Sequence, residues 1–284
     1  MKSFLKLTLL TLIMISIWGC KKQTELLNSE KDIREKIEIT TNYGSMVIEL
    51  YNETPLHRDN IIKLLNSRAY DSLLFHRVIH KFMIQGGDPD SKNAKVGSRL
   101  GDGDAPYTVK SEFNDKLFHK KGALAAARDD NPEKASSAMQ FYIVHGTKFN
   151  DSLLKIEEKG INRNKAREYF KNNNSKKSLL DSIQLASEQD NMKHYNYLMD
   201  SIMRLANKEE YFKPYIISKE QREVYKSIGG APFLDQNYTV FGEVVKGIEI
   251  LDAIAGVKTN SSDRPLNDVR IQTIKLMDYL EVEP

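Results

Sequence analysis

The sequence predicts a mainly β domain that is interrupted by a helical insertion, and three observations support this fold class. Apolar and polar residues alternate along residues 36–50, as they do in half-buried strands. Beyond residue 71, short apolar runs are separated by loops rich in Gly and Asp. Between residues 148 and 228, apolar residues recur at helical spacing in a stretch rich in Lys, Glu and Asn.

The first 19 residues are typical of a targeting signal rather than of a folded element. Two lysines precede the uncharged stretch 7–19, whose 13 residues are fewer than the ~20 that a membrane-spanning helix needs. The stretch ends at Cys20 and resembles a bacterial lipoprotein signal, in which this Cys carries lipid after cleavage. The alternative is a buried N-terminal helix with an incidental Cys. We expect signal peptide 1–19, lipid on Cys20, polar tether 20–35, and a location in the bacterial cell envelope, at the outer membrane facing the periplasm.

Composition and charge exclude several other classes of protein. The 284 residues include 42 Lys and Arg against 39 Asp and Glu, a formal net charge of +3 that does not favour nucleic acid as a partner. The single Cys excludes an internal disulfide and a zinc site built from several thiolates. The hydrophobic content of 40% is that of a globular protein, so the fold depends on its core.

The elements are expected in the following order. Residues 36–50 predict two antiparallel strands around the turn Asn42-Tyr43-Gly44. A helix follows Thr54-Pro55, because Pro is accepted in a first helical turn and the next residues carry an apolar face. Later runs predict further strands and a second helix: strands near 73–79, 82–87, 122–127, 139–144 and 270–280, a strand-and-turn region from 229, and a helix near 246–257.

The change of pattern near residue 148 indicates an insertion. Residues 148–228 predict two or three amphipathic helices, and the strand pattern resumes afterwards. We therefore expect one host domain, formed by residues 36–147 and 229–281, with the helices inserted between its halves. Five of the aromatic residues of the insertion either contact substrate or pack its own core: Tyr195, Tyr197, Tyr211, Phe212 and Tyr215.

Residues 75–88 read FHRVIHKFMIQGGD, and this run resembles the signature of the cyclophilins, the β-barrel peptidyl-prolyl isomerases. The resemblance continues, in the family's order, through APYTVKSEFN, GALAAAR, MQFYIV, FLDQNYTVFGEV and KGIEILDAI. It implies a closed eight-stranded antiparallel barrel with two capping helices. It also implies isomerisation of proline-containing peptides and unfolded envelope proteins, without a cofactor or metal.

The resemblance also implies the residues of the site. Arg77 matches the catalytic arginine, which donates to the prolyl nitrogen when the amide twists. Phe82 and Gln85 match the other catalytic positions, with Gln85 and Gln140 orienting the substrate backbone and the arginine. The substrate-binding positions, of which Ala127 and Arg128 receive the residues before proline, are Met83, Ala127, Arg128, Gln140, Tyr142, Phe233, Leu234 and Tyr238.

Three positions depart from the family pattern. Tyr142 stands at the usual pocket Phe, Phe233 at the Trp-or-Phe position, and Tyr238 at a frequent His. The hydroxyl of Tyr142 is the change that we expect to affect the rate, because it adds a polar group where the pocket should be dry. This leaves two alternatives open: a binding module or holdase chaperone that has lost catalysis, and a structural part of an envelope complex.

The two histidines of the run and the aromatic residues assigned to the pocket each allow a second interpretation. His76 and His80 share one face of the predicted strand, but no third ligand is evident, so no metal site is expected. The pocket aromatics match plain core positions of a barrel as well as pocket positions. Only the spacing of the family signature separates these two interpretations.

Overall fold

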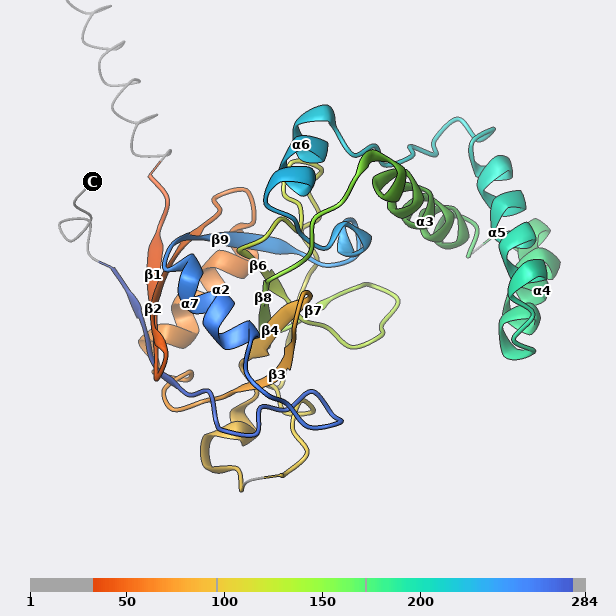
Figure 1. Cartoon of the computed structure of the whole chain (residues 1–284). Coiled ribbons are helices and arrows are strands. Elements are labelled where there is room, and N and C mark those ends of the chain that lie inside the picture. Colours follow the sequence, from red (N-terminus) through yellow and green to blue (C-terminus); the bar gives the residue numbers. More distant parts are fainter. Residues whose placement is uncertain (1–32, 96, 172, 278–284) are drawn as a thin grey trace, which may run out of the picture. The chain divides into compact units, whose positions relative to one another are not determined.

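The computed structural model describes residues 33–277, apart from residues 96 and 172 and the side chain of residue 174. The predicted signal peptide, Cys20 and most of the tether lie outside the described residues. The sheet and the helices discussed below lie between Lys36 and residue 277 (Figure 1).

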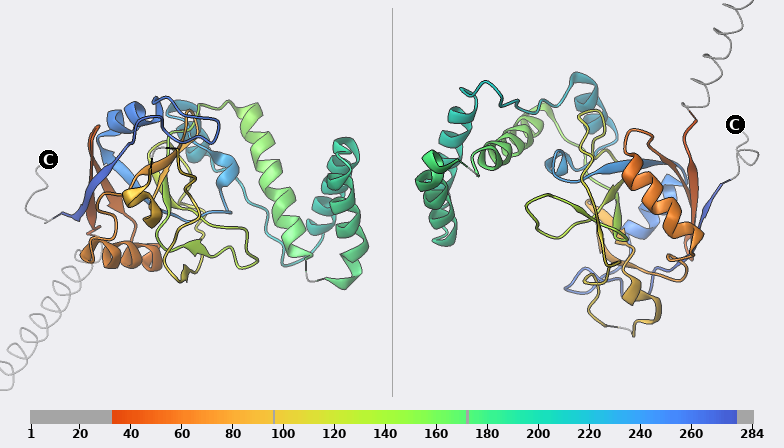
Figure 2. Two further views of the ribbon diagram at one scale, coloured as in Figure 1. Left: turned by 90° about the horizontal axis from the view of Figure 1, so that it is seen from below. Right: turned by 180° about the vertical axis from the view of Figure 1, so that it is seen from behind.

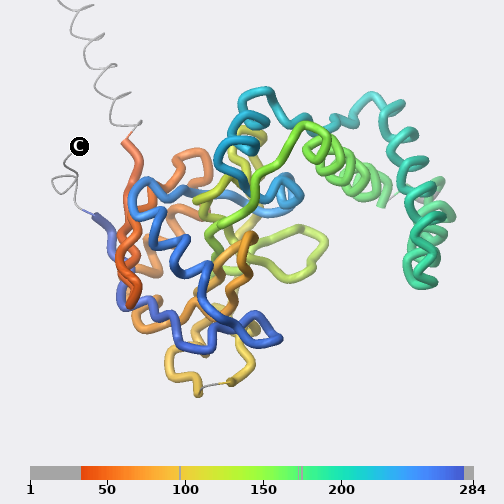
Figure 3. Tube along the Cα trace, in the orientation of Figure 1, coloured from red at the N-terminus to blue at the C-terminus, as the bar shows by residue number. Residues whose placement is uncertain are grey.

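Eight antiparallel strands form the main sheet, in the order β10-β1-β2-β9-β6-β8-β4-β3. The first two strands form the predicted hairpin and run side by side (Figure 3). A separate two-stranded sheet pairs β5 with β7. The strand bounds are β1 Lys36–Thr41, β2 Gly44–Leu50, β3 Phe75–Ile79, β4 Met83–Gly86, β5 Thr108–Val109, β6 Ala123–Ala126, β7 Ser136–Ser137, β8 Phe141–Val144, β9 Val240–Lys246 and β10 Ile271–Leu276.

The sheet curls into a half-barrel, and its edge strands β3 and β10 do not form a ladder with each other in the described residues. The edges meet only over a short stretch, where Leu74 and Arg270 form an isolated bridge. Beyond it, the amide of Val78 donates to the carbonyl of Asp263 in a loop, at 2.8 Å, instead of to β10. The mainly β class with eight strands is confirmed, but the prediction of a closed barrel is wrong in this respect.

Two helices pack against the sheet and share its core. They are α2, Pro55–Asn66, and α7, Ile248–Ala255. The core joins their apolar faces to the inward residues of the strands, as the alternating pattern predicts. Its fully buried members include Ile37, Ile48, Ile84, Ile143, Leu251 and Ile254.

The helical segment, residues 148–228, lies between β8 and β9 and contains four α-helices rather than the expected two or three. They are α3 Asp151–Tyr169, α4 Lys177–Glu188, α5 Met192–Ala206 and α6 Lys219–Ser227. The views agree that α4 and α5 lie side by side (Figure 2). None of the helices in the described part of the chain is both long enough and apolar enough to cross a bilayer.

The segment contains two apolar clusters. A distal cluster joins α4 and α5 to the end of α3, with Phe170 and Ile202 fully buried. A proximal cluster joins Leu154, Tyr215 and Tyr225 of the segment, with Phe118 of the host packed against it. Of the five aromatic residues considered above, Tyr215 and Phe212 are buried, Tyr195 is half-buried, and Tyr197 and Tyr211 are exposed.

The two ends of the helical segment are joined to each other at the sheet. Thr147 and Gly230 exchange both backbone hydrogen bonds, each 3.0 Å long. Gly230 is required at this point, because a Cβ atom there would collide with the carbonyl oxygen of His119 and with the Tyr225 ring. The segment therefore leaves and re-enters the host at one closely packed place.

This packing predicts opposite effects for two Gly→Ala substitutions. Gly230→Ala should lower the free energy of unfolding by about 1–3 kcal/mol, because the added methyl overpacks the junction. Gly160→Ala, within α3, meets nothing within 4 Å and should raise it by about 0.5–1 kcal/mol through helix propensity. Urea unfolding of both variants tests this, and a neutral Gly230→Ala would show that the junction is loosely packed.

Candidate active site

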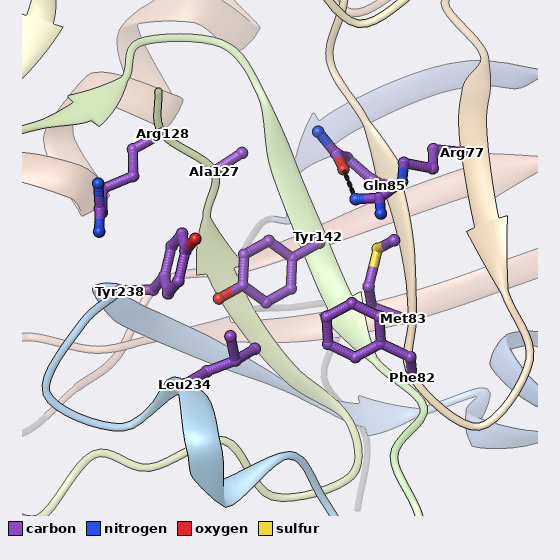
Figure 4. A pocket seen from close by; sticks show the side chains of 9 residues that line it. All are labelled: Arg77, Phe82, Met83, Gln85, Ala127, Arg128, Tyr142, Leu234 and Tyr238. Carbon is purple, nitrogen blue, oxygen red and sulfur yellow. Dashed lines mark hydrogen bonds between the residues drawn. The ribbon is translucent and has the colours of Figure 1, made fainter. Parts of the chain in front are cut away.

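One pocket gathers nine of the side chains that the sequence singles out (Figure 4). Its volume is about 140 Å³, which is small beside the roughly 300–1,000 Å³ of sites for drug-sized ligands. A pocket of this size suits a single side chain or ring. The lining residues are Arg77, Phe82, Met83, Gln85, Ala127, Arg128, Tyr142, Leu234 and Tyr238.

Strand register places the central residues in one row. Arg77 of β3 is opposite Gln85 of β4, and Gln85 is opposite Tyr142 of β8. Because successive side chains of a strand point to opposite faces, their neighbours Ile84 and Ile143 point into the core instead. The same three strands therefore supply the core with one face and the pocket with the other.

A chain of side-chain hydrogen bonds orients the polar edge of the pocket. Arg77 Nη1 donates to Gln85 Oε1 at 3.4 Å, and Gln85 Nε2 donates to Gln140 Oε1 at 2.9 Å. Gln140 Nε2 in turn donates to the carbonyls of Gly101 and Gly103, both at 2.8 Å. Because a carbonyl can only accept, the side-chain amide of Gln140 must turn its NH₂ group toward Gly101 and Gly103 and its oxygen toward Gln85. The side-chain amide of Gln85 then donates to Gln140 and turns its own oxygen toward Arg77.

The guanidinium of Arg77 is half-exposed at the rim of the pocket. Its side chain is 44% exposed, and its Nε lies 3.6 Å from Asp263 Oδ2. A guanidinium has five N–H donors, and the contacts named here engage two of them. Arg77 is thus held in direction while donors remain for a ligand.

Arg77 and Gln85 also border a second hollow, of about 350 Å³. It is lined by the loop 97–102 and by Asn260, Ser262 and Arg264. The arginine therefore stands between the pocket and this hollow and lines both.

The far edge of the pocket is fixed by Arg128. Its Nε and Nη2 donate to the backbone and side-chain oxygens of Asn237, at 3.1 and 3.0 Å. Its guanidinium lies over the Tyr238 ring, 4.9 Å from the centroid, and Tyr238 meets Tyr142 edge to face at 5.9 Å. Arg128 therefore holds the aromatic wall in place.

Two of the predicted residues do not line the pocket. Gln140 is buried behind Gln85 and reaches the site only through the hydrogen bond described above. Phe233 is 48% exposed and lies against Phe82, with ring centroids 5.5 Å apart. Phe233 therefore extends the apolar surface outside the pocket rather than forming its floor.

The hydroxyl of Tyr142 has a buried partner that the sequence did not reveal. It lies 3.0 Å from Nε2 of His119, whose Nδ1 lies 2.8 Å from Oδ1 of Asp235. Burial, with smaller contributions from Tyr238 and Asp235, raises the pKa of Tyr142 well above its ordinary value, so the hydroxyl keeps its proton. A Tyr at an apolar position signals that a partner is needed, but one sequence does not say which residue supplies it.

His76 and His80, the two histidines of the signature run, have different surroundings. His76 is buried, and burial lowers its pKa to about 4, so its ring is neutral at neutral pH. The Nδ1 of His80 lies 3.2 Å from the carbonyl oxygen of Ala255. In the described part of the chain, no group of three or more His, Cys, Asp or Glu side chains is placed to hold a metal ion.

Comparison with known proteins decides the family. The model of the cyclophilin type peptidyl-prolyl cis-trans isomerase family matches residues 36–199 and 155–276. The chain belongs to this family. A putative peptidyl-prolyl cis-trans isomerase of Staphylococcus haemolyticus is 28% identical over 254 residues, which cover 89% of this chain and 96% of that protein.

Two other comparisons agree with the cyclophilin assignment. A putative bifunctional phosphatase/peptidyl-prolyl cis-trans isomerase of Streptococcus pyogenes is 28% identical over 255 residues, and the match spans only 41% of that longer protein. A crystal structure of a Cryptosporidium parvum cyclophilin type isomerase matches with a TM-score of 0.50 at 17% identity, over 87% of this chain and 99% of that one. At this identity, the structural match supports the fold alone.

Proposed function

We propose that this cyclophilin catalyses cis-trans isomerisation of Xaa-Pro bonds through Arg77 and assists protein folding in the bacterial cell envelope, where a lipid on Cys20 anchors it. The observation that supports catalysis is the position of Arg77. Its guanidinium stands at the rim of a pocket that suits one ring and is lined mostly by apolar and aromatic side chains, and Gln85 directs its donors.

The reaction needs little more than this arrangement. Rotation about a peptide bond crosses a barrier of ~18–20 kcal/mol, because amide resonance is lost in the twisted state. No bond is made or broken, so catalysis consists of binding the twisted amide more tightly than either planar form. In the twisted state the prolyl nitrogen regains its lone pair, and Arg77 donates a hydrogen bond to it that neither planar form accepts.

The remaining residues hold the substrate in register. Met83, Leu234 and Tyr142 seat the pyrrolidine ring against apolar and aromatic surface, which places its nitrogen within reach of the arginine. Ala127 and Arg128 form the edge that receives the residues before proline. The substrate chain then passes Arg77 toward the second hollow, where backbone and polar side chains of a peptide find partners.

The envelope location rests on the N-terminal sequence. Two lysines, an uncharged stretch and Cys20 follow one another in the order typical of a lipoprotein signal. Loss of residues 1–19 would leave a net charge of +1, too weak for electrostatic attachment to anionic lipid. Acyl chains on Cys20 would hold the protein instead, at about 0.8 kcal/mol for each buried methylene.

Replacement of Arg77 tests the catalytic proposal. Exchange between the cis and trans forms of a short Xaa-Pro peptide is measured by NMR with the full chain. Arg77→Ala should lower kcat/KM by about 10²–10³-fold, because it removes a donor used mainly in the transition state. Arg204→Ala, an exposed arginine on α5, is the matched control and should leave the rate unchanged.

Two results would contradict parts of this proposal. If the wild-type chain leaves the exchange at its uncatalysed rate yet suppresses aggregation of an unfolded protein, the chain is a holdase rather than an isomerase. If Arg77→Ala retains the wild-type rate, the isomerase stands but the role of Arg77 is wrong.

Replacement of Cys20 tests the anchor. In a bacterial host, the wild-type chain should fractionate with membranes, and mass spectrometry should find acyl chains on its N-terminal peptide. Cys20→Ser should remove the lipid and release the chain into the soluble fraction, because one thioether carries the anchor. Unchanged fractionation of Cys20→Ser, or a wild-type peptide without lipid, would overturn the anchor proposal.

A further inference from the structure

A buried carboxylate connects the proline pocket to the helical segment. Asp235 follows Leu234, the pocket residue that ends the short 3-10 helix η3, Pro232–Leu234. Its Oδ1 accepts hydrogen bonds from the backbone N–H and Nδ1 of His119, at 3.0 and 2.8 Å. Its Oδ2 accepts from the hydroxyls of Tyr215 and Tyr225, at 3.0 and 2.7 Å. The carboxylate and its partners are all 3% exposed or less: Asp235, His119, Tyr215 and Tyr225.

The directions of these hydrogen bonds follow from chemistry. Four donors converge on Asp235, so the carboxylate acts only as an acceptor. The proton of the His119 ring is therefore on Nδ1, and in the neutral ring Nε2 accepts from the Tyr142 hydroxyl. Burial, and next the charge of Asp235, raises the pKa of Tyr215 and of Tyr225, which keeps both hydroxyls protonated as donors.

On the side of the pocket, the hydrogen bonds around Asp235 hold two of the residues that line it. Tyr142 is fixed through His119, and Leu234 is fixed because Asp235 is the next residue in the chain. The Tyr142 ring lies between Leu234 and Met83 in the centre of the pocket (Figure 4). A small shift of Asp235 therefore moves both surfaces against which a proline ring packs.

On the other side, the helical segment holds the two tyrosines. Asn162 of α3 clamps the backbone of Tyr215, accepting from its N–H at 2.7 Å and donating to its carbonyl at 2.8 Å. Tyr225 of α6 packs edge to face on Phe118 and Phe149, with ring centroids 5.2 and 6.2 Å apart. Both tyrosines are therefore held by contacts beyond their hydrogen bonds to Asp235.

We propose that the helical segment is a positioning part of the proline pocket, in which Tyr215 and Tyr225 fix Asp235 and, through His119, the ring of Tyr142. The inference rests on the proposed function of that pocket. A buried carboxylate that loses a donor has to find another partner or move, because an unpaired charge in a dry site is costly. The tyrosines thus act on the reaction through the pocket walls, without touching the substrate.

A double-mutant cycle tests this inference in the full chain. Tyr225→Phe and Tyr215→Phe each remove one hydroxyl, and each should lower kcat/KM for a short Xaa-Pro peptide by about three- to tenfold. In the Tyr142→Phe background, the same substitutions should lower kcat/KM by a smaller factor, since the link to the ring is already cut and only the link to Leu234 remains. Tyr211→Phe, on the exposed surface of the same segment, should have no effect.

Nitrogen NMR of His119 supplies a readout that general destabilisation would not move. The wild-type spectrum should show a proton on Nδ1, which faces Asp235 Oδ1 at 2.8 Å. Tyr142→Phe should shift the Nε2 signal, because its donor is lost, whereas Tyr211→Phe should leave it in place. Circular dichroism confirms that each variant is folded before its rate is compared.

Several outcomes would overturn the inference. Folded Tyr215→Phe and Tyr225→Phe variants with the wild-type rate would do so, as would equal rate losses with and without the Tyr142 hydroxyl. If the wild-type chain itself does not catalyse, the proposed function fails separately. In that case the double-mutant cycle is measured on the affinity of the chain for the same peptide. If the effect of Tyr215→Phe or Tyr225→Phe on this affinity is the same with and without Tyr142→Phe, the positioning role is overturned.

Discussion

The buried charge of Asp235 is the constraint on which the architecture around the site depends. A carboxylate with almost no access to water needs a full set of donors, and the protein draws them from two places. His119 contributes two from the host, while Tyr215 and Tyr225 contribute two from the helical segment. The segment is thereby tied to the host by electrostatics as well as by its reciprocal junction at Thr147 and Gly230.

Because successive side chains of β3, β4 and β8 point to opposite faces, one face of these strands packs in the core and the other lines the pocket. Ile84 and Ile143 face the core, while Gln85 and Tyr142 beside them face the pocket. Isomerisation makes no covalent demands, so a rigid apolar seat and one well-aimed donor suffice. Arg77, Met83 and Tyr142 lie on strands, which hold side-chain directions better than loops do, whereas Leu234 lies on the 3-10 helix η3.

Much of the fold and part of the site follow from the sequence for identifiable reasons. Period-two alternation indicates the hairpin 36–50, and the run 75–88 contains β3, the turn and β4, so one motif carries Arg77 and Gln85 together. By contrast, α6 buries only Gln221 and Tyr225, so it has no apolar stripe from which a fourth helix could be predicted.

The partners of Tyr142 were not predictable from one sequence. His119 and Asp235 are 116 positions apart, and neither stands out by type or spacing. The departure from a closed barrel also depends on a distant contact, because Val78 bonds to the loop at Asp263 instead of to a strand. Such contacts are set by tertiary packing, which local patterns do not encode.

The most direct test of the account is to locate the proline ring of a bound peptide. Intermolecular NOEs are measured between an isotopically labelled Xaa-Pro peptide and the methyl groups of Met83 and Leu234. The account predicts strong NOEs from the pyrrolidine protons to both methyl groups, with the residue before proline near Ala127. NOEs from the ring to the second hollow around residues 97–102, with none to Met83 or Leu234, would contradict it.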